Sequence, residues 1–214
     1  MSPLALLGGT FDPIHNGHLR MALECAEQAD LDEVRIVPLH TPPHRQAPAA
    51  TPEQRLVMAR LAVQGVARLA VDDSEIRRGG ASYTIDTVLA LRRALGDRPL
   101  CLIMGMDAFA ALDTWRQWTS LLECVHIIVV ERPGNETRIE SEDVASLLES
   151  RSTDRPGDLH DLPAGRILKL PVPLLDISAT RIRRIVAEGR DPSFLLPDAV
   201  IDYIRKERLY LARA

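Results

Sequence analysis

The sequence predicts an α/β fold with a doubly wound parallel sheet and a small helical subdomain at the C-terminal end. Short apolar runs of strand length recur along the chain, and helical patterns separate most of them. The runs are almost continuously apolar, which is typical of parallel strands covered by helices on both faces. The predicted strands are Leu4–Leu7, Val34–Val37, Leu69–Val71, Leu100–Met104, His126–Val130 and Ile167–Leu170.

Three helices have clear signals in the sequence. A helix is predicted to begin after the N-cap Thr51, because Pro52 suits the first helical position and Gln54 completes a capping box. A helix after the first strand and a late helix that ends at Gly189 place apolar side chains on one helical face. These side chains are Leu19, Ala22, Leu23 and Ala26 in the first case, and Ile182, Ile185 and Val186 in the second.

The domain organisation is expected to be simple. Residues 1–175 are predicted to form the α/β domain, and residues 176–214 its C-terminal helical part. Residues 135–165 are markedly more polar than the rest of the chain. There we expect a short helix near Val144–Leu148 with loop around it, as in an insertion or a mobile region.

The composition excludes several classes of protein. The chain has 214 residues, 46% of them hydrophobic, and a net charge of −4, which gives no overall basic field for binding nucleic acid. No apolar run approaches the roughly 20 residues that span a bilayer, and no signal peptide is evident, so we expect a cytoplasmic protein. The three cysteines form no CxxC pair and suit reduced, buried thiols. Monomer and homo-oligomer both remain open.

The segment "GGTFDPIHNGH", residues 8–18, follows the first predicted strand and leads into a helix. Glycines in such a loop let a phosphate approach the backbone, and the helix offers unpaired N–H groups to an anion. The segment matches neither GxGxxG nor GxxxxGK[ST]. His15 and His18 are three residues apart, so both rings can face one object, and Gly17 between them is expected to leave room for it.

Two other interpretations of this segment compete with a phosphate site. The turns and histidines could be ordinary surface features that cap the helix. Alternatively, a metal could bind, because four histidines lie within thirty residues, although no cysteine or closely spaced acid completes a zinc set. The four are His15, His18, His40 and His44.

The twelve residues "GGTFDPIHNGHL" resemble the signature of the HxGH nucleotidyltransferases. Members of this family have a Rossmann-like fold and transfer a nucleotidyl group from a nucleoside triphosphate to a phosphate or similar acceptor. The resemblance implies that His15 and His18 contact the triphosphate and stabilise the charge that develops during transfer. It also implies that ATP binds along Gly8, Gly9, Thr10 and Phe11.

A second motif, "DISATRIRR", covers residues 176–184. Ser178 and Thr180 can cap a helix or bind phosphate, and the arginines that follow oppose the helix dipole unless an anion lies there. A capped amphipathic helix in an arginine-rich protein is the alternative. Beside the first motif, "ISATRIR" resembles the second signature of the family, which implies that Ser178 and Thr180 contribute to the ATP site and that Arg183 is catalytic.

The chemistry that follows from this resemblance needs few protein groups. An acceptor phosphate is already ionised near neutral pH, so neither a general base nor a covalent nucleophile is required. We expect catalysis from alignment of the attacking oxygen and from charge stabilisation by His15, His18 and Arg183. Mg²⁺ is expected to arrive on the ATP phosphates, with no side-chain ligands.

Three further segments follow predicted strands: "LHTPPHR" (39–45), "GGASYTIDTV" (79–88) and "GMDAFAALDTWRQW" (105–118). Together they resemble the branch of the family that adenylylates nicotinate mononucleotide, giving nicotinic acid adenine dinucleotide and pyrophosphate. The resemblance implies that Trp115 stacks on the pyridine ring and that main-chain N–H groups near Thr84 and Arg116 meet the carboxylate. It further implies phosphate contacts from His44 and Arg45, and a place for Asp107 in the nucleotide pocket.

Other functions remain as alternatives. Phosphopantetheine or the amide mononucleotide could be the acceptor, although "SYTIDT" and "DTWRQW" would then have no role. A nucleotide-binding regulator without turnover would not need intact His15, His18 and Arg183. A tRNA-synthetase-like enzyme is disfavoured, because the chain lacks a KMSKS-like segment.

Overall fold

A computed structural model describes residues 2–43, 47–131, 137–173 and 175–212. Its centre is a seven-stranded sheet in the order β3-β2-β1-β4-β5-β7-β6, in which every neighbouring pair is parallel. The predicted strands are all confirmed, and β6 is an additional two-residue edge strand. The strands are β1 (Leu4–Gly9), β2 (Glu33–Pro38), β3 (Leu69–Val71), β4 (Leu100–Gly105), β5 (His126–Glu131), β6 (Ser152–Thr153) and β7 (Ile167–Pro171).

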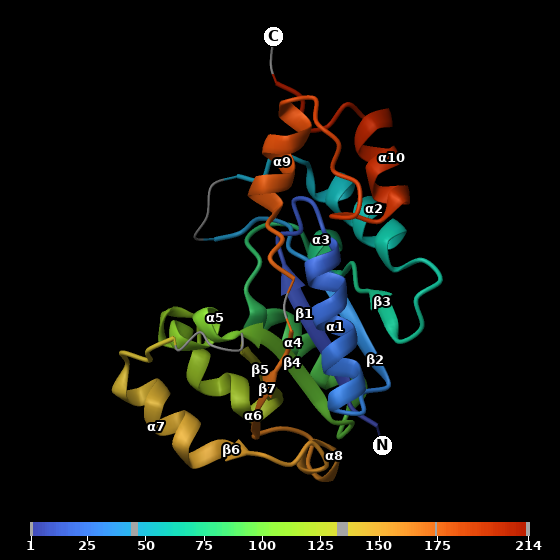
Figure 1. The fold of residues 1–214 in the computed structure, drawn as a ribbon. Coiled ribbons are helices and arrows are strands. Elements are labelled where there is room, and N and C mark those ends of the chain that lie inside the picture. Colours follow the sequence, from blue (N-terminus) through green and yellow to red (C-terminus); the bar gives the residue numbers. More distant parts are fainter. Residues whose placement is uncertain (1, 44–46, 132–136, 174, 213–214) are drawn as a thin grey trace.

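Helices connect these strands and cover both faces of the sheet (Figure 1). The α-helices are α1 (Asn16–Gln28), α2 (Pro52–Val63), α3 (Ser74–Arg78), α4 (Thr84–Leu95), α5 (Met106–Ala110), α6 (Leu121–Cys124), α7 (Glu142–Arg151), α8 (Asp158–Asp161), α9 (Ala179–Ala187) and α10 (Asp198–Lys206). Two short 3₁₀ helices are η1 (Leu112–Thr114) and η2 (Trp118–Ser120). No helix in the described ranges is long and apolar enough to cross a membrane.

The predicted capping box of α2 is confirmed. The Thr51 side chain accepts a hydrogen bond from the Gln54 backbone at 3.2 Å, and the Gln54 side chain accepts one from the Thr51 backbone at 2.9 Å. The late helix, α9, ends at Ala187, and Gly189 follows with a φ of 67°. Glycine adopts this left-handed conformation at little cost, so it suits the end of a helix.

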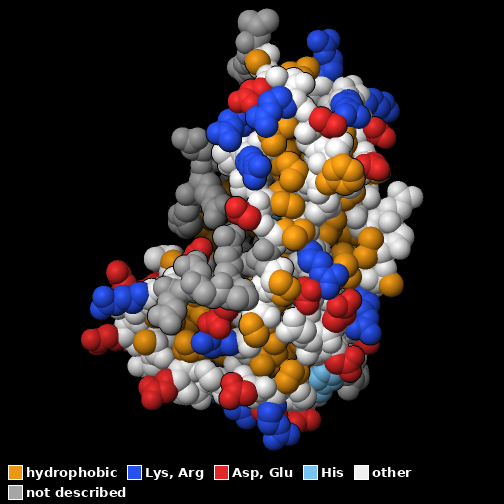
Figure 2. Space-filling view, in the orientation of Figure 1, with side chains coloured by type: hydrophobic (Ala, Val, Ile, Leu, Met, Phe, Trp, Pro, Cys, Tyr) orange, Lys and Arg blue, Asp and Glu red, His pale blue; other side chains and the backbone are white. Residues whose placement is uncertain are grey.

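The core consists of two apolar layers, one on each face of the sheet. In β1, Ala5 and Leu7 face the layer that includes α1, α2 and α10, whereas Leu4 and Leu6 face the layer that includes α4, α6 and α7. Both sides of the strand are therefore buried, which explains the continuous apolar run in the sequence. Figure 2 shows hydrophobic side chains along the middle of one face, with charged side chains of both signs around them.

The polar segment 135–165 contains more regular structure than expected. One helix was predicted, but the described part also holds β6 and α8. Val144 of α7 packs into one core layer and Leu159 of α8 into the other. The segment was difficult to predict because its elements are short and bury few side chains, and because β6 carries no apolar run.

The sheet order creates a switch point at β1. The chain passes from β1 to β2 and β3 on one side, then returns to β4 on the other side of β1 and continues to β5. The connections after β1 and β4 therefore diverge, which leaves a crevice at the carboxyl ends of these strands. The first motif follows β1 at that edge.

Candidate active site

A cleft of about 1180 Å³ opens at the switch point. Its floor comes from the ends of β1 and β4, and its walls come from the loops after β2 and β3, the η1 region and the start of α9. Its size falls at or just above the roughly 300–1,000 Å³ range that is typical of small-molecule sites. Segments far apart in the sequence therefore share one cleft that can hold two nucleotide-sized molecules.

His15 and His18 lie face to face at the start of α1. Their ring centroids are 3.7 Å apart with an interplanar angle of 20°, and the His15 backbone N–H donates to His18 Nδ1 at 3.3 Å. This bond leaves Nε2 of His18, a cleft-lining residue, as the ring atom that carries the proton when His18 is neutral. Nδ1 of the buried His15 has no hydrogen-bond partner among the described residues.

Burial keeps both histidines neutral at pH 7. Burial lowers the pKa of His15 to about 4, and burial together with the charge of His15 lowers the pKa of His18 to about 3. Stacked rings so close together resist simultaneous protonation. A bound polyphosphate would favour the protonated form, so its arrival would raise both pKa values.

Two glycines of the first motif lie so close to an aromatic ring that a side chain at their positions would collide with it. A Cβ atom on Gly9 would lie 2.8 Å from the Phe11 ring, and one on Gly17 would lie 3.0 Å from Nδ1 of His15. The expectation that Gly17 leaves room for a ligand therefore needs correction, because its space is taken by the His15 ring. Gly8 also lines the cleft, and there, by contrast, a Cβ atom would have no neighbour within 4 Å.

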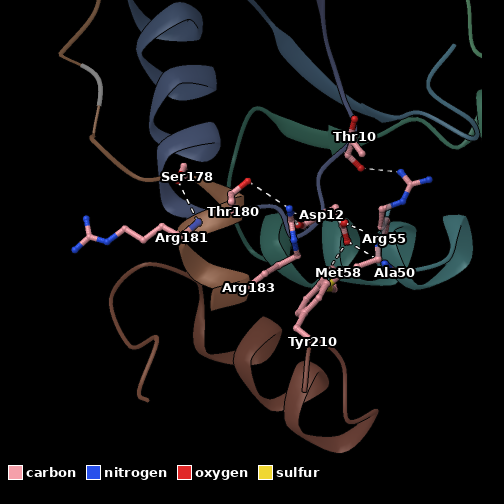
Figure 3. Close-up of polar contacts among 11 residues, drawn as sticks. Thr10, Asp12, Ala50, Arg55, Met58, Ser178, Thr180, Arg181, Arg183 and Tyr210 are labelled. Carbon is pink, nitrogen blue, oxygen red and sulfur yellow. Dashed lines mark hydrogen bonds and ion pairs between the residues drawn. The ribbon is translucent and has the colours of Figure 1, made fainter. Parts of the chain in front are cut away.

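Arg183 faces the first motif from α9. Its Nη1 donates to the Asp12 carbonyl oxygen at 2.6 Å, and its Nη2 donates to Thr180 Oγ1 at 3.3 Å (Figure 3). Ser178 is the N-cap of α9, and its Oγ accepts a hydrogen bond from the Arg181 backbone at 3.2 Å. Arg183 and Thr180 line the main cleft, whereas Ser178 lies beside a smaller cavity of about 250 Å³.

The opposite part of the cleft contains the start of α4 and the residues after η1. Thr84 is the first residue of α4, and the Arg116 guanidinium lies 4.7 Å from the centroid of the Tyr83 ring. Both tryptophans pack against the apolar layer, but only Trp115 is also among the described residues that line the cleft. One tryptophan of the pair is thus available to a ligand.

The structure brings most of the predicted site residues together. The cleft lining contains the following: Gly8, Gly9, Thr10, Phe11, His18, Thr84, Trp115, Arg116, Thr180 and Arg183. Asp107 is exposed on α5, accepts a hydrogen bond from Thr137 at 3.0 Å and is not among the lining residues. His44 and Arg45 lie outside the described residues.

Three polar residues of this region were not identified from the sequence. The fully buried Arg55 donates to the carbonyl oxygens of Thr10 at 2.7 Å and His40 at 2.8 Å, and so joins the loops after β1 and β2. Glu75 lines the cleft and accepts a hydrogen bond from Thr87, and burial raises the pKa of its carboxyl group. Asp12 lies within the first motif, but its partners could not be identified from that segment alone.

No group of three or more histidine, cysteine or acidic side chains that could hold a metal occurs among the residues described. His40 contacts Thr41 Oγ1 at 2.9 Å and the Gly80 carbonyl oxygen at 3.1 Å. Of the four histidines considered for zinc, His15 and His18 form a stacked pair. His44, the fourth of these histidines, lies outside the described residues.

Comparison with known proteins is consistent with this geometry. The cytidylyltransferase-like family model matches residues 6–185, a stretch that contains both motifs and all of the sheet except the first two residues of β1. The chain belongs to the cytidylyltransferase-like family. The family resemblance inferred from the two motifs is thereby confirmed.

Curated relatives of this cytidylyltransferase-like chain cover nearly its full length. A protein of Marinobacter nauticus named probable nicotinate-nucleotide adenylyltransferase is 50% identical over 209 residues, which cover 97% of this chain and 96% of the relative. A protein of Aeromonas hydrophila with the same name is 46% identical over 211 residues, which cover 97% of each chain.

A solved structure confirms the fold of this cytidylyltransferase-like chain. The nicotinic acid mononucleotide adenylyltransferase of Plasmodium falciparum, complexed with NaAD, superposes with a TM-score of 0.73. The match covers 98% of both chains at 16% identity. At this identity the similarity establishes the α/β architecture.

Proposed function

We propose that this protein is a nicotinate-nucleotide adenylyltransferase, which transfers AMP from ATP to nicotinate mononucleotide. The products are nicotinic acid adenine dinucleotide and pyrophosphate. The observation that carries the proposal is the single cleft, which joins a histidine–arginine site to a tryptophan and a helix start. The names of the curated relatives support the same activity.

The triphosphate would lie between the first motif and α9. His18 and Arg183 line the cleft from opposite elements, and Gly8 leaves the strand end open to a phosphate. His15 supports the His18 ring from behind by stacking. We propose His15, His18 and Arg183 as the catalytic residues. The N–H groups of His18 and Arg183, which line the cleft, can stabilise the charge that builds on the departing pyrophosphate, and the stacked His15 holds the His18 ring in place.

Nicotinate mononucleotide would occupy the other part of the cleft. The Trp115 ring would stack on the pyridine ring, and main-chain N–H groups near Thr84 and Arg116 would bind the carboxylate. His44 and Arg45, which follow β2 in the sequence, are proposed to contact phosphate. Asp107 is proposed to approach the nucleotide from α5.

The reaction would proceed by direct in-line attack without a covalent intermediate. A phosphate oxygen of nicotinate mononucleotide bonds to the α-phosphorus of ATP, and the bond from that phosphorus to the oxygen bridging to the β-phosphate breaks. The bridging oxygen and its electron pair leave with pyrophosphate. The protein aligns the two phosphates and needs no general base, because the attacking phosphate is already ionised.

Magnesium is proposed to enter with ATP and to partly neutralise the phosphate oxygens. Two carboxylates line the cleft, those of Asp12 and Glu75. The oxygens of Asp12 already accept three hydrogen bonds from protein groups, and Glu75 is buried against Thr87. This donor set fits a hydrated ion carried by the substrate better than an ion held by the protein.

Pyrophosphate release tests the proposal. The purified protein is supplied with MgATP and, in separate reactions, nicotinate mononucleotide, the amide mononucleotide or phosphopantetheine. We expect turnover with the nicotinate form and at least tenfold slower turnover with the other two, because the carboxylate site discriminates by charge. Equal or faster turnover with either of the other acceptors would reject the proposed substrate.

A further inference from the structure

A hydrogen bond joins the C-terminal end of the chain to the first motif. The Tyr210 hydroxyl donates to Asp12 Oδ1 at 2.7 Å, across a sequence separation of 198 residues (Figure 3). Tyr210 is half-buried against the core layer of α1, α2 and α10, and Asp12 is 5% exposed. A charge-assisted hydrogen bond in such an environment is strong and directional.

Asp12 also connects two other segments that border the cleft. Its Oδ2 accepts a hydrogen bond from the Ala49 backbone at 2.8 Å, and its Oδ1 accepts one from the Ala50 backbone at 3.1 Å. Its carbonyl oxygen accepts the 2.6 Å hydrogen bond from Arg183. One residue therefore links the first motif, the segment before α2 and the catalytic face of α9.

The position of the Arg183 guanidinium depends on Asp12. Asp12 provides both the carbonyl acceptor and a carboxylate oxygen 3.8 Å from Nη1 of Arg183. Without the Tyr210 hydroxyl, Oδ1 would keep only the longer bond to Ala50. A shift of the Asp12 backbone would then move the Arg183 guanidinium by a similar distance, and transfer reactions are sensitive to displacements near 1 Å.

We propose that Tyr210 is a positioning residue for the transfer reaction, which acts through Asp12 to hold Arg183 at the triphosphate. The inference rests on the proposed function and adds to it a residue outside both motifs. Tyr210 itself is not among the residues that line the cleft. Burial and the adjacent Asp12 carboxylate raise the pKa of the Tyr210 hydroxyl, so it remains a donor at all physiological pH values.

The test combines Tyr210→Phe with Arg183→Gln. In the protein with Arg183, we expect Tyr210→Phe to lower kcat about tenfold. In the Arg183→Gln background, the same substitution should change kcat less than twofold, because the residue that Tyr210 positions is gone. Equal factors in both backgrounds, or no effect in the protein with Arg183, would overturn the inference.

Tyr203→Phe is the matched control. Tyr203 lies on α10 and packs against the same core layer, but it does not contact Asp12. We expect this variant to keep kcat within twofold of the wild-type value. Thermal melting of all variants checks folding. If Tyr203→Phe lowered kcat as much as Tyr210→Phe, the effect would come from general packing, and the inference would fail.

A binding measurement separates this inference from the proposed acceptor. Calorimetry with inorganic tripolyphosphate should show about tenfold weaker binding for Tyr210→Phe when Arg183 is present, and no difference in the Arg183→Gln background. If nicotinate mononucleotide is not a substrate but this coupling is found, the proposed function fails and the inference holds. If nicotinate mononucleotide is turned over but the kinetic measurement shows no coupling, the inference fails and the proposed function holds.

Discussion

The two halves of the cleft are built differently. The half proposed to bind the triphosphate contains the two continuous motifs, in which the His15 and His18 rings stack and Arg183 donates hydrogen bonds to Asp12 and Thr180. The half proposed to bind the acceptor is built from the start of α4, at Thr84, and from the Trp115–Arg116 segment after η1, and Arg116 there is exposed. This difference predicts that substitutions in the two motifs affect the transfer step, whereas substitutions near Thr84 and Trp115 affect binding of the acceptor.

The largest expected effect concerns the triphosphate half. We expect Arg183→Ala to lower kcat by roughly 10²–10³, because loss of one group that stabilises transition-state charge has an effect of this size. Arg181→Ala is the matched control, since Arg181 is in the same turn of α9 but its side chain points away from Asp12 (Figure 3). Steady-state kinetics with MgATP measure both. A comparable loss in the control would remove the distinction between the two arginines.

A second substitution tests the acceptor half separately. Trp115→Ala should raise KM for nicotinate mononucleotide roughly 10-fold to 100-fold, because stacking on an aromatic side chain contributes about 1–3 kcal/mol. The KM for ATP should change less than twofold. Trp118→Phe is the control, because Trp118 packs against the same core layer as Trp115 but does not line the cleft. A joint rise in both KM values after Trp115→Ala would show that the halves are not independent.

The pH dependence of stability tests the histidine pair. The pKa values of His15 and His18, about 4 and about 3, lie below the unfolded value of 6.5. Between these values the two histidines are protonated in the unfolded chain and neutral in the folded chain. Stability should therefore be complete above pH 6.5 and fall as the pH decreases, by at most about 2 kcal/mol per histidine at pH 5. Urea unfolding of wild type and His18→Gln between pH 7 and pH 5 measures this loss. The variant should lose less, and an equal loss would contradict the neutral pair.

The smallest expected effect comes from a glycine that supports the triphosphate half indirectly. Gly17→Ala places a Cβ atom 3.0 Å from Nδ1 of His15, so the ring must move by a few tenths of an ångström. We expect kcat to fall roughly threefold to tenfold. Ala22→Gly, on the buried face of α1, is a control that weakens the same helix without touching the ring. The interpretation fails if the two variants have equal kcat at equal stability.

How much of the molecule could be predicted from the sequence depends on the distance along the chain between the residues that form each feature. The apolar strands, the capping box at Thr51 and both motifs were identified because each depends on residues close together in the chain. The bonds of Tyr210 and Arg55 were missed because their partners are 198 and 45 residues away. In a chain with arginine as its usual cation, Arg55 carries no signal that separates it from a surface residue.

The central claim is that one cleft holds ATP at the histidine–arginine half and nicotinate mononucleotide at the tryptophan half. A crystal structure with nicotinic acid adenine dinucleotide tests it most directly, because this product spans both halves. We expect the pyridine ring on Trp115, its carboxylate at the N–H groups near Thr84, and the adenylyl phosphate beside His18. A pyridine ring bound away from Trp115, or the dinucleotide in the reverse orientation, would contradict the claim.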